Sequence, residues 1–198
     1  MGFGDNLKKL VTQAADGLDK LQEMSEQQQA KQSREDIDAE RERQAEIAGL
    51  PTADVQLTGT GWAAGAWTGS MHYGWNEISP DDAGKKLLWF ELFAADGEEP
   101  VLGGHRLTHW SFQIYGWAGD GTYDLVEICR AREAAGWSTD YLEWEIAFAD
   151  SDDATFYFTP DTGPASVTVT GGGKHLSVSI SASGAISDLT LAGEITRS

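Results

Sequence analysis

Residues 165–182 read ASVTVTGGGKHLSVSISA, and this stretch decides the fold class. Apolar side chains alternate with Ser and Thr on both sides of three consecutive glycines. Strict alternation is typical of a strand with one buried face, and a Gly-rich connection between two such runs is typical of a β-hairpin. The stretch therefore predicts two antiparallel strands whose core side chains are Val167, Val169, Leu176, Val178 and Ile180.

The same period of two recurs from Val55 to the end of the chain. The apolar faces of these runs predict further core residues: Leu88, Phe90, Leu92, Ala94, Trp110, Phe112, Ile114, Leu142, Trp144, Ile146, Phe148, Phe156 and Phe158. The period predicts about ten strands, near 55–61, 65–74, 86–95, 106–117, 121–130, 141–149, 154–159, 165–170, 174–182 and 186–196. Turn signals such as Ala95-Asp96-Gly97 separate them, and no helix of convincing length is expected between them. Residues 51–198 are therefore predicted to form a mainly β domain, either an antiparallel β-sandwich or jelly-roll, or a closed barrel.

The first 50 residues follow a helical period instead. On a helical wheel, one set of apolar side chains falls within an arc of about 100°. These side chains are Phe3, Leu7, Leu10, Val11, Ala14, Leu18 and Leu21. We predict an amphipathic docking helix over 1–24 and a polar helical spacer or linker over 25–50, which Gly49 and Pro51 end.

The polar face of this helix carries lysines and aspartates in equal number. A basic membrane-binding helix would carry an excess of Lys and Arg. The spacing of the apolar residues resembles a short coiled-coil seam, which favours a partner helix or self-association. Docking on the chain's own β domain and membrane contact through residues 1–21 remain open.

The net charge is −18, from 32 acidic and 14 basic side chains. Residues 51–198 hold 21 of the acidic and 7 of the basic ones, so they carry −14. A field of this sign repels phosphate backbones, so we expect no binding to nucleic acid. Mimicry of DNA toward a basic partner, adaptation to high salt, and a simple contribution to solubility are all consistent with the charge.

The chain has a single cysteine, Cys129, which cannot form an internal disulfide. A reducing compartment fits this composition. The run Leu125-Val126-Glu127-Ile128-Cys129 reads as a strand, so the thiol is predicted to be a core residue. No apolar run reaches the roughly 18 residues of a membrane span, and no secretory signal is visible, so a cytoplasmic protein is expected.

Aromatic and acidic side chains share the predicted outer faces of three strands. They are Trp89, Glu91, His109, Tyr115, Trp117, Tyr141, Glu143 and Glu145. If these strands are neighbours, the face could bind a sugar chain, a peptide or a cationic ligand. The alternative is a solvated sheet face that a helix or loop partly covers.

Signals for catalysis are few. Tyr115-Gly116-Trp117 followed by Leu125-Val126-Glu127 resembles a stretch of the small jelly-roll xylanases, and this resemblance implies that Glu127 is a nucleophilic carboxylate. It covers fewer than a dozen positions, and the second signature of those enzymes, a Glu that enters a Gly/Ser-rich strand, is not found.

His105 and His109 lie about 13 Å apart on one strand, too far to share a metal. We expect no catalytic residue, no metal and no cofactor.

These observations favour a non-enzymatic binding or assembly protein. Its N-terminal helix would dock on a protein partner or multimerise, and its acidic, aromatic β domain would contact a partner. Two alternatives remain: a carbohydrate-active β-sandwich, either a binding module or a hydrolase, and an acidic decoy or immunity-type inhibitor of a basic protein.

Overall fold

The computed structural model describes residues 39–78, 84–95, 97–134, 145–149, 155–157, 161–184 and 187–198. The chain divides into two units, Met1–Glu46 and Ile47–Ser198. Residues 39–48 are helical, within the predicted spacer. The remainder of the predicted N-terminal helix lies outside the described residues. That remainder includes all the docking residues: Phe3, Leu7, Leu10, Val11, Leu18 and Leu21.

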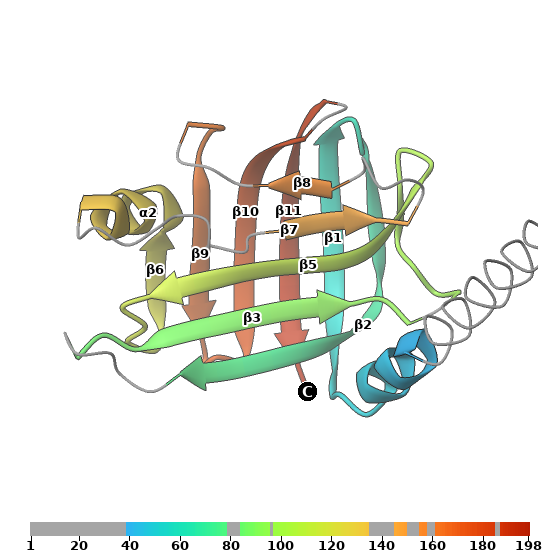
Figure 1. Ribbon diagram of the computed structural model, residues 1–198, viewed down its shortest axis with the longest axis horizontal. Coiled ribbons are helices and arrows are strands. Elements are labelled where there is room, and N and C mark those ends of the chain that lie inside the picture. The colour runs from blue at the N-terminus through green and yellow to red at the C-terminus, as the bar shows by residue number, and fades with distance from the viewer. Residues whose placement is uncertain are drawn as a thin grey trace, which may run out of the picture. The chain divides into compact units, whose positions relative to one another are not determined.

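The second unit is mainly β, as predicted, and eight of its strands form a closed antiparallel barrel (Figure 1). Around the ring these are β1 (Thr52–Gly61), β2 (Gly65–Ile78), β3 (Leu87–Phe93), β5 (His105–Tyr115), β7 (Glu145–Phe148), β8 (Thr155–Tyr157), β10 (His175–Gly184) and β11 (Asp188–Arg197), which pairs again with β1. Three strands lie outside the ring: β4 (Val101–Leu102) beside β5, β9 (Ala165–Thr170) beside β10, and β6 (Gly121–Asp124) beside β9. Of the architectures that the sequence left open, the chain forms the barrel.

The barrel interior is packed with side chains. Figure 1 shows β2, β3 and β5 crossing β1, β10 and β11, so that two walls face each other. The alternating residues predicted to be core are buried wherever they are described: Leu88, Phe90, Leu92, Ala94, Trp110, Phe112, Ile114, Ile146, Phe148, Phe156, Val167, Val169, Leu176, Val178 and Ile180. Leu142, Trp144 and Phe158 lie outside the described residues. Trp110 packs closely on Gly193 of β11, where an added Cβ would come within 2.7 Å of the indole. A larger residue at 193 would therefore displace the central tryptophan.

The sheet branches at β10. One edge of β10 pairs with β11 from His175 to Ser183. The other edge is shared, because β9 pairs with it as far as Ile180 and β8 pairs with it at Ser183 and Gly184. Among the described residues, two residue pairs therefore close the barrel between β8 and β10, while β9 and β6 continue away from the ring.

The predicted strand over 121–130 is wrong beyond Asp124, because a helix follows β6. This helix, α2 (Leu125–Ala134), begins where Asp124 Oδ1 accepts hydrogen bonds from the backbone N–H groups of Val126 and Glu127, at 2.9 and 3.1 Å. A short apolar run suits either period, and the Asp cap favours the helix. Leu125 and Cys129, one turn apart, are buried in the core. No helix within the described ranges has the length and apolarity that a bilayer crossing requires.

Aromatic side chains fill the end of the barrel where β1 turns into β2. Trp62, in that turn, stacks on His105 with ring centroids 3.6 Å apart. Phe148 and Phe156 pack against the same indole at 5.1 Å. Edge and offset contacts of this kind contribute beyond simple burial. This end of the barrel is therefore plugged by side chains from four different segments.

Burial on α2 has a testable consequence for pH. Desolvation raises the pKa of the Cys129 thiol to about 11, and the neighbouring Glu133 carboxylate adds to this effect. Below the pKa of the unfolded chain, about 8.5, the thiol is neutral in both states and does not affect the free energy of unfolding. Between this pH and about 11 the thiol ionises more readily in the unfolded chain, so the folded state loses stability as pH rises. Urea unfolding at pH 8 and pH 11 should show the native chain losing on the order of 2 kcal/mol more than Cys129→Ala. Equal losses in the two proteins would contradict this prediction.

Candidate functional site

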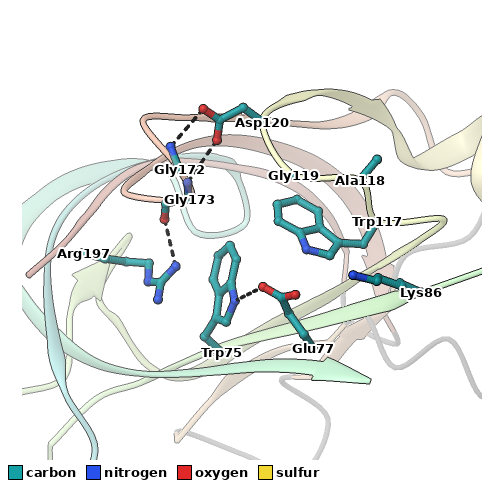
Figure 2. Close-up of a pocket in the computed structure, with 10 residues that line it drawn as sticks. All are labelled: Trp75, Glu77, Lys86, Trp117, Ala118, Gly119, Asp120, Gly172, Gly173 and Arg197. Carbon is teal, nitrogen blue, oxygen red and sulfur yellow. Dashed lines mark hydrogen bonds between the residues drawn. The ribbon is translucent and has the colours of Figure 1, made fainter. Parts of the chain in front are cut away.

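A pocket of about 640 Å³ lies at the end of the barrel opposite Trp62 (Figure 2). Five segments contribute to its wall: the end of β2, the residue before β3, the β5–β6 loop, the β9–β10 turn and the end of β11. The lining residues are Trp75, Glu77, Lys86, Trp117, Ala118, Gly119, Asp120, Gly172, Gly173 and Arg197. Its volume is within the range of about 300–1,000 Å³ that is usual for small-molecule sites. We call it the Trp75–Trp117 pocket.

Trp75 is held from several sides. Its ring meets Trp117 edge to face, with centroids 5.5 Å apart and an interplanar angle of 80°. Its indole N–H donates to Glu77 Oε1 at 3.1 Å. The Arg197 guanidinium lies over the ring, 3.8 Å from its centroid. This cation–π contact and the hydrogen bond fix the orientation of the indole.

Backbone hydrogen bonds place Trp117 beside Lys86. The N–H groups of Gly116 and Trp117 both donate to the Lys86 carbonyl, at 2.8 and 3.1 Å. Tyr123 packs against the Trp117 ring at 5.5 Å, and its hydroxyl donates to the Gly119 carbonyl at 2.6 Å. The β5–β6 loop therefore presents a fixed tryptophan next to a lysine.

Asp120 ties this loop to the β9–β10 turn. Its two carboxylate oxygens accept hydrogen bonds from the N–H groups of Gly172 and Gly173, at 2.9 and 3.0 Å. The Gly173 carbonyl in turn accepts a hydrogen bond from Arg197 Nη1 at 2.9 Å. Charge-assisted bonds of this kind are stronger than neutral ones. The two elements are 52 residues apart in the sequence but act as one wall of the pocket.

The outer face predicted from the sequence forms in part. Trp89 and Glu91 of β3 and His109 and Tyr115 of β5 lie on adjacent strands. Trp89 pairs with Gln113 and Glu91 with Ser111, so the four predicted residues are close together but are not cross-strand pairs. Glu145 begins β7, the next strand of the ring. Tyr141 and Glu143 lie outside the described residues.

This outer face is largely withdrawn from solvent. The His109 ring nitrogen Nε2 is 3.4 Å from Glu91 Oε1, and Phe93 stacks on the imidazole at 4.9 Å. Between the predicted residues, Ser111 and Gln113 are only 1% and 6% exposed. The structure therefore brings these residues into a half-buried cluster in which His109 lies beside Glu91. Trp117 is not part of this cluster and belongs to the Trp75–Trp117 pocket.

The other lining side chains have no signature in the sequence. Trp75, Glu77, Lys86, Asp120 and Arg197 span more than 120 positions, and no spacing motif connects them. The local signals at the pocket are Gly119-Asp120-Gly121 and Gly171-Gly172-Gly173, and each of them predicts only a turn. Glu127, which the xylanase resemblance implied to be a strand nucleophile, lies in the first turn of α2 and not on a strand.

Substituting two neighbouring glycines tests how closely the pocket wall is packed. Both have positive φ, +70° at Gly172 and +81° at Gly173, so alanine is strained at either position by roughly 1–2 kcal/mol. A Cβ at Gly172 meets no atom within 4 Å, whereas one at Gly173 lies 3.1 Å from both Trp75 and Arg197. Gly173→Ala should therefore be the more destabilising and should alter the tryptophan near-UV signal, which Gly172→Ala leaves intact. Identical spectra for the two variants would show that the turn does not pack on Trp75.

No protein-family model matches this chain, and no curated protein or solved structure matches it either. Any assignment of function must therefore come from the chemistry of the pocket itself.

Proposed function

We propose that this chain is a non-enzymatic binding protein whose barrel takes a small polar ligand in the Trp75–Trp117 pocket. In this proposal the segment 1–24 docks on a protein partner or multimerises, and so positions the barrel. The observation that carries the proposal is the pocket: its ligand-sized volume is bounded by two fixed indoles and by charged side chains from distant segments.

The fixed geometry of the wall supports binding. Hydrogen bonds or ring contacts hold Trp75, Trp117, Asp120 and Arg197 in place before any ligand arrives. A site that is already ordered loses little conformational entropy on binding, so more of the contact energy appears as affinity. Aromatic walls with a few convergent polar groups are the usual composition of such sites.

The use of the pocket carboxylates supports a binding role over a hydrolytic one. Both Asp120 oxygens accept backbone N–H groups, and one Glu77 oxygen accepts the Trp75 indole N–H. A general acid must hold a proton and deliver it to the substrate. Carboxylates that hold the wall together serve a structural purpose, and the pocket then supplies contacts without acid–base chemistry.

Trp75→Phe tests the ligand site. Phenylalanine keeps an aromatic ring under Arg197 but removes the indole N–H and part of the contact area. A small polar ligand identified by intrinsic-fluorescence screening of the full chain should bind about tenfold more weakly to this variant, a loss of about 1.4 kcal/mol. Trp67→Phe is the matched control, because Trp67 is on the same strand but does not line the pocket.

The control should leave the affinity within about twofold. If every ligand found by the screen binds equally well to Trp75→Phe, the pocket is not the ligand site.

Charge substitution tests the N-terminal segment. Replacing Leu7, Leu10 and Leu18 by Glu places charge on the predicted apolar stripe. Light scattering should then show a lower solution mass, or a pull-down should show loss of the partner, while the circular dichroism of the barrel is retained. The control Asn6→Asp, Gln13→Glu and Gln27→Glu adds the same charge away from the stripe and should change neither. Unchanged assembly in the Leu→Glu variant would contradict the docking role.

A further inference from the structure

In the Trp75–Trp117 pocket most side-chain acceptors already have a hydrogen-bond partner within the described part of the chain, whereas several donors do not. Three of its four carboxylate oxygens already accept a bond, and only the second Glu77 oxygen is without a donor among the described residues. The donors are mostly unused. Lys86 is exposed, and across the described residues its ammonium contacts no acceptor. The Trp117 indole N–H likewise has none, and Figure 2 shows it on the side of the ring that faces Glu77.

Arg197 brings positive charge to the pocket, but much of its guanidinium is committed to the wall. Its Nη1 donates to the Gly173 carbonyl, and its Nε is buried, out of reach of a ligand in the pocket. The complement of the pocket is therefore a ligand rich in acceptors, with at most a few donors for the remaining Glu77 oxygen.

Positive charge also gathers at this pocket. Residues 51–198 hold seven basic side chains against 21 acidic ones. Two of the seven, Lys86 and Arg197, line the pocket. A ligand that carries negative charge therefore finds its counter-charges here, although the domain as a whole repels anions.

The charge of the ligand is limited by the same surroundings. Glu77 and Asp120 lie in the wall, and the domain carries −14. Repulsion from these groups grows in proportion to ligand charge, whereas Lys86 and Arg197 supply only two positive charges. A monoanion is therefore favoured over a phosphate dianion. A carboxylate accepts hydrogen bonds at both oxygens and suits a guanidinium and an ammonium equally well.

We propose that the pocket binds a sugar ring that carries a carboxylate, as in a uronic acid. This inference rests on the proposed function, which it makes more specific. A C–H face of the ring packs on Trp75, which is half-buried, while Trp117, only 8% exposed, packs on Trp75 and holds it in place. The carboxylate accepts from Lys86, the charge of Arg197 adds attraction from the other side of Trp75, and a ring hydroxyl donates to the second Glu77 oxygen.

The test compares four probes on the full chain by calorimetry and tryptophan fluorescence. Glucuronic acid has the ring and one negative charge, its methyl ester has the ring alone, glucose 6-phosphate has the ring and close to two charges, and acetate has the charge alone. Glucuronic acid should bind at least tenfold more tightly than each of the others. Equal binding of the neutral ester, tighter binding of glucose 6-phosphate, or no binding of glucuronic acid overturns the inference.

Lys86→Met identifies the charge that matters. Methionine keeps most of the apolar stem, and Lys86 is exposed, so the fold is expected to persist. The variant should lose about tenfold in affinity for glucuronic acid and little for the ester. Lys174→Met removes the same charge from an exposed residue that does not line the pocket and should lose less than threefold. Equal losses in the two variants would indicate a general field effect and overturn the assigned contact.

The two proposals fail in different ways. If the ester binds as well as the acid and Trp75→Phe still weakens both, the pocket is a ligand site and only the charge assignment is wrong. If Trp75→Phe changes the binding of no ligand, the proposed function itself fails.

Discussion

The pocket depends on the way β10 divides one of its edges between two strands. Because β9 occupies the first part of that edge, β8 can reach only the last two residues, and the sheet must branch. The branch carries the β9–β10 turn to the end of the barrel where β2 and β11 also end. Asp120, in the loop before β6, then lies within hydrogen-bonding distance of Gly172 and Gly173. A simple eight-strand meander would have no second element at this position.

Arg197 joins the architecture to the chemistry. It belongs to the last residues of β11, yet its guanidinium lies over both Tyr73 and Trp75 of β2, 5.0 and 3.8 Å from the ring centroids. A planar, permanently charged group suits this stacked position, which a lysine could not fill in the same way. The same side chain fixes the Gly173 carbonyl through Nη1 and buries its Nε. One residue thus joins β11, β2 and the β9–β10 turn, and it places a positive charge at the pocket in a domain with few cations.

The sequence predicted the strands and the core of the β domain well and the residues of the pocket poorly. The success and the failure have different physical causes. Alternation along a strand is a local property, so residues such as Phe90, Phe112 and Val178 were predicted to be core and are buried. The strand predicted after Asp124 is wrong because a short apolar run suits either period, and the side-chain cap that Asp124 provides favours the helix. The pocket could not be predicted, because Trp75, Asp120 and Arg197 meet only through strand order, which no local pattern encodes. The outer face of β3 and β5 was visible as a pattern, but the burial of Ser111 and Gln113 was not.

Among the described residues, two pairs join β8 to β10, and three each join β7 to β8 and β5 to β7, so we expect the barrel to open first on this side. Nine residue pairs join β10 to β11. In the part of the chain that the structure describes, the pairs that join β8 to β10 are Tyr157–Ser183 and Phe156–Gly184. Local opening is least costly where the fewest backbone bonds must break together. Separation of β8 from β10 would expose Phe156 and the aromatic side chains at that end of the barrel. The pairing of β10 with β11, the strand that carries Arg197, would be kept. The molecule can thus fluctuate at one end of its barrel without loosening the opposite rim.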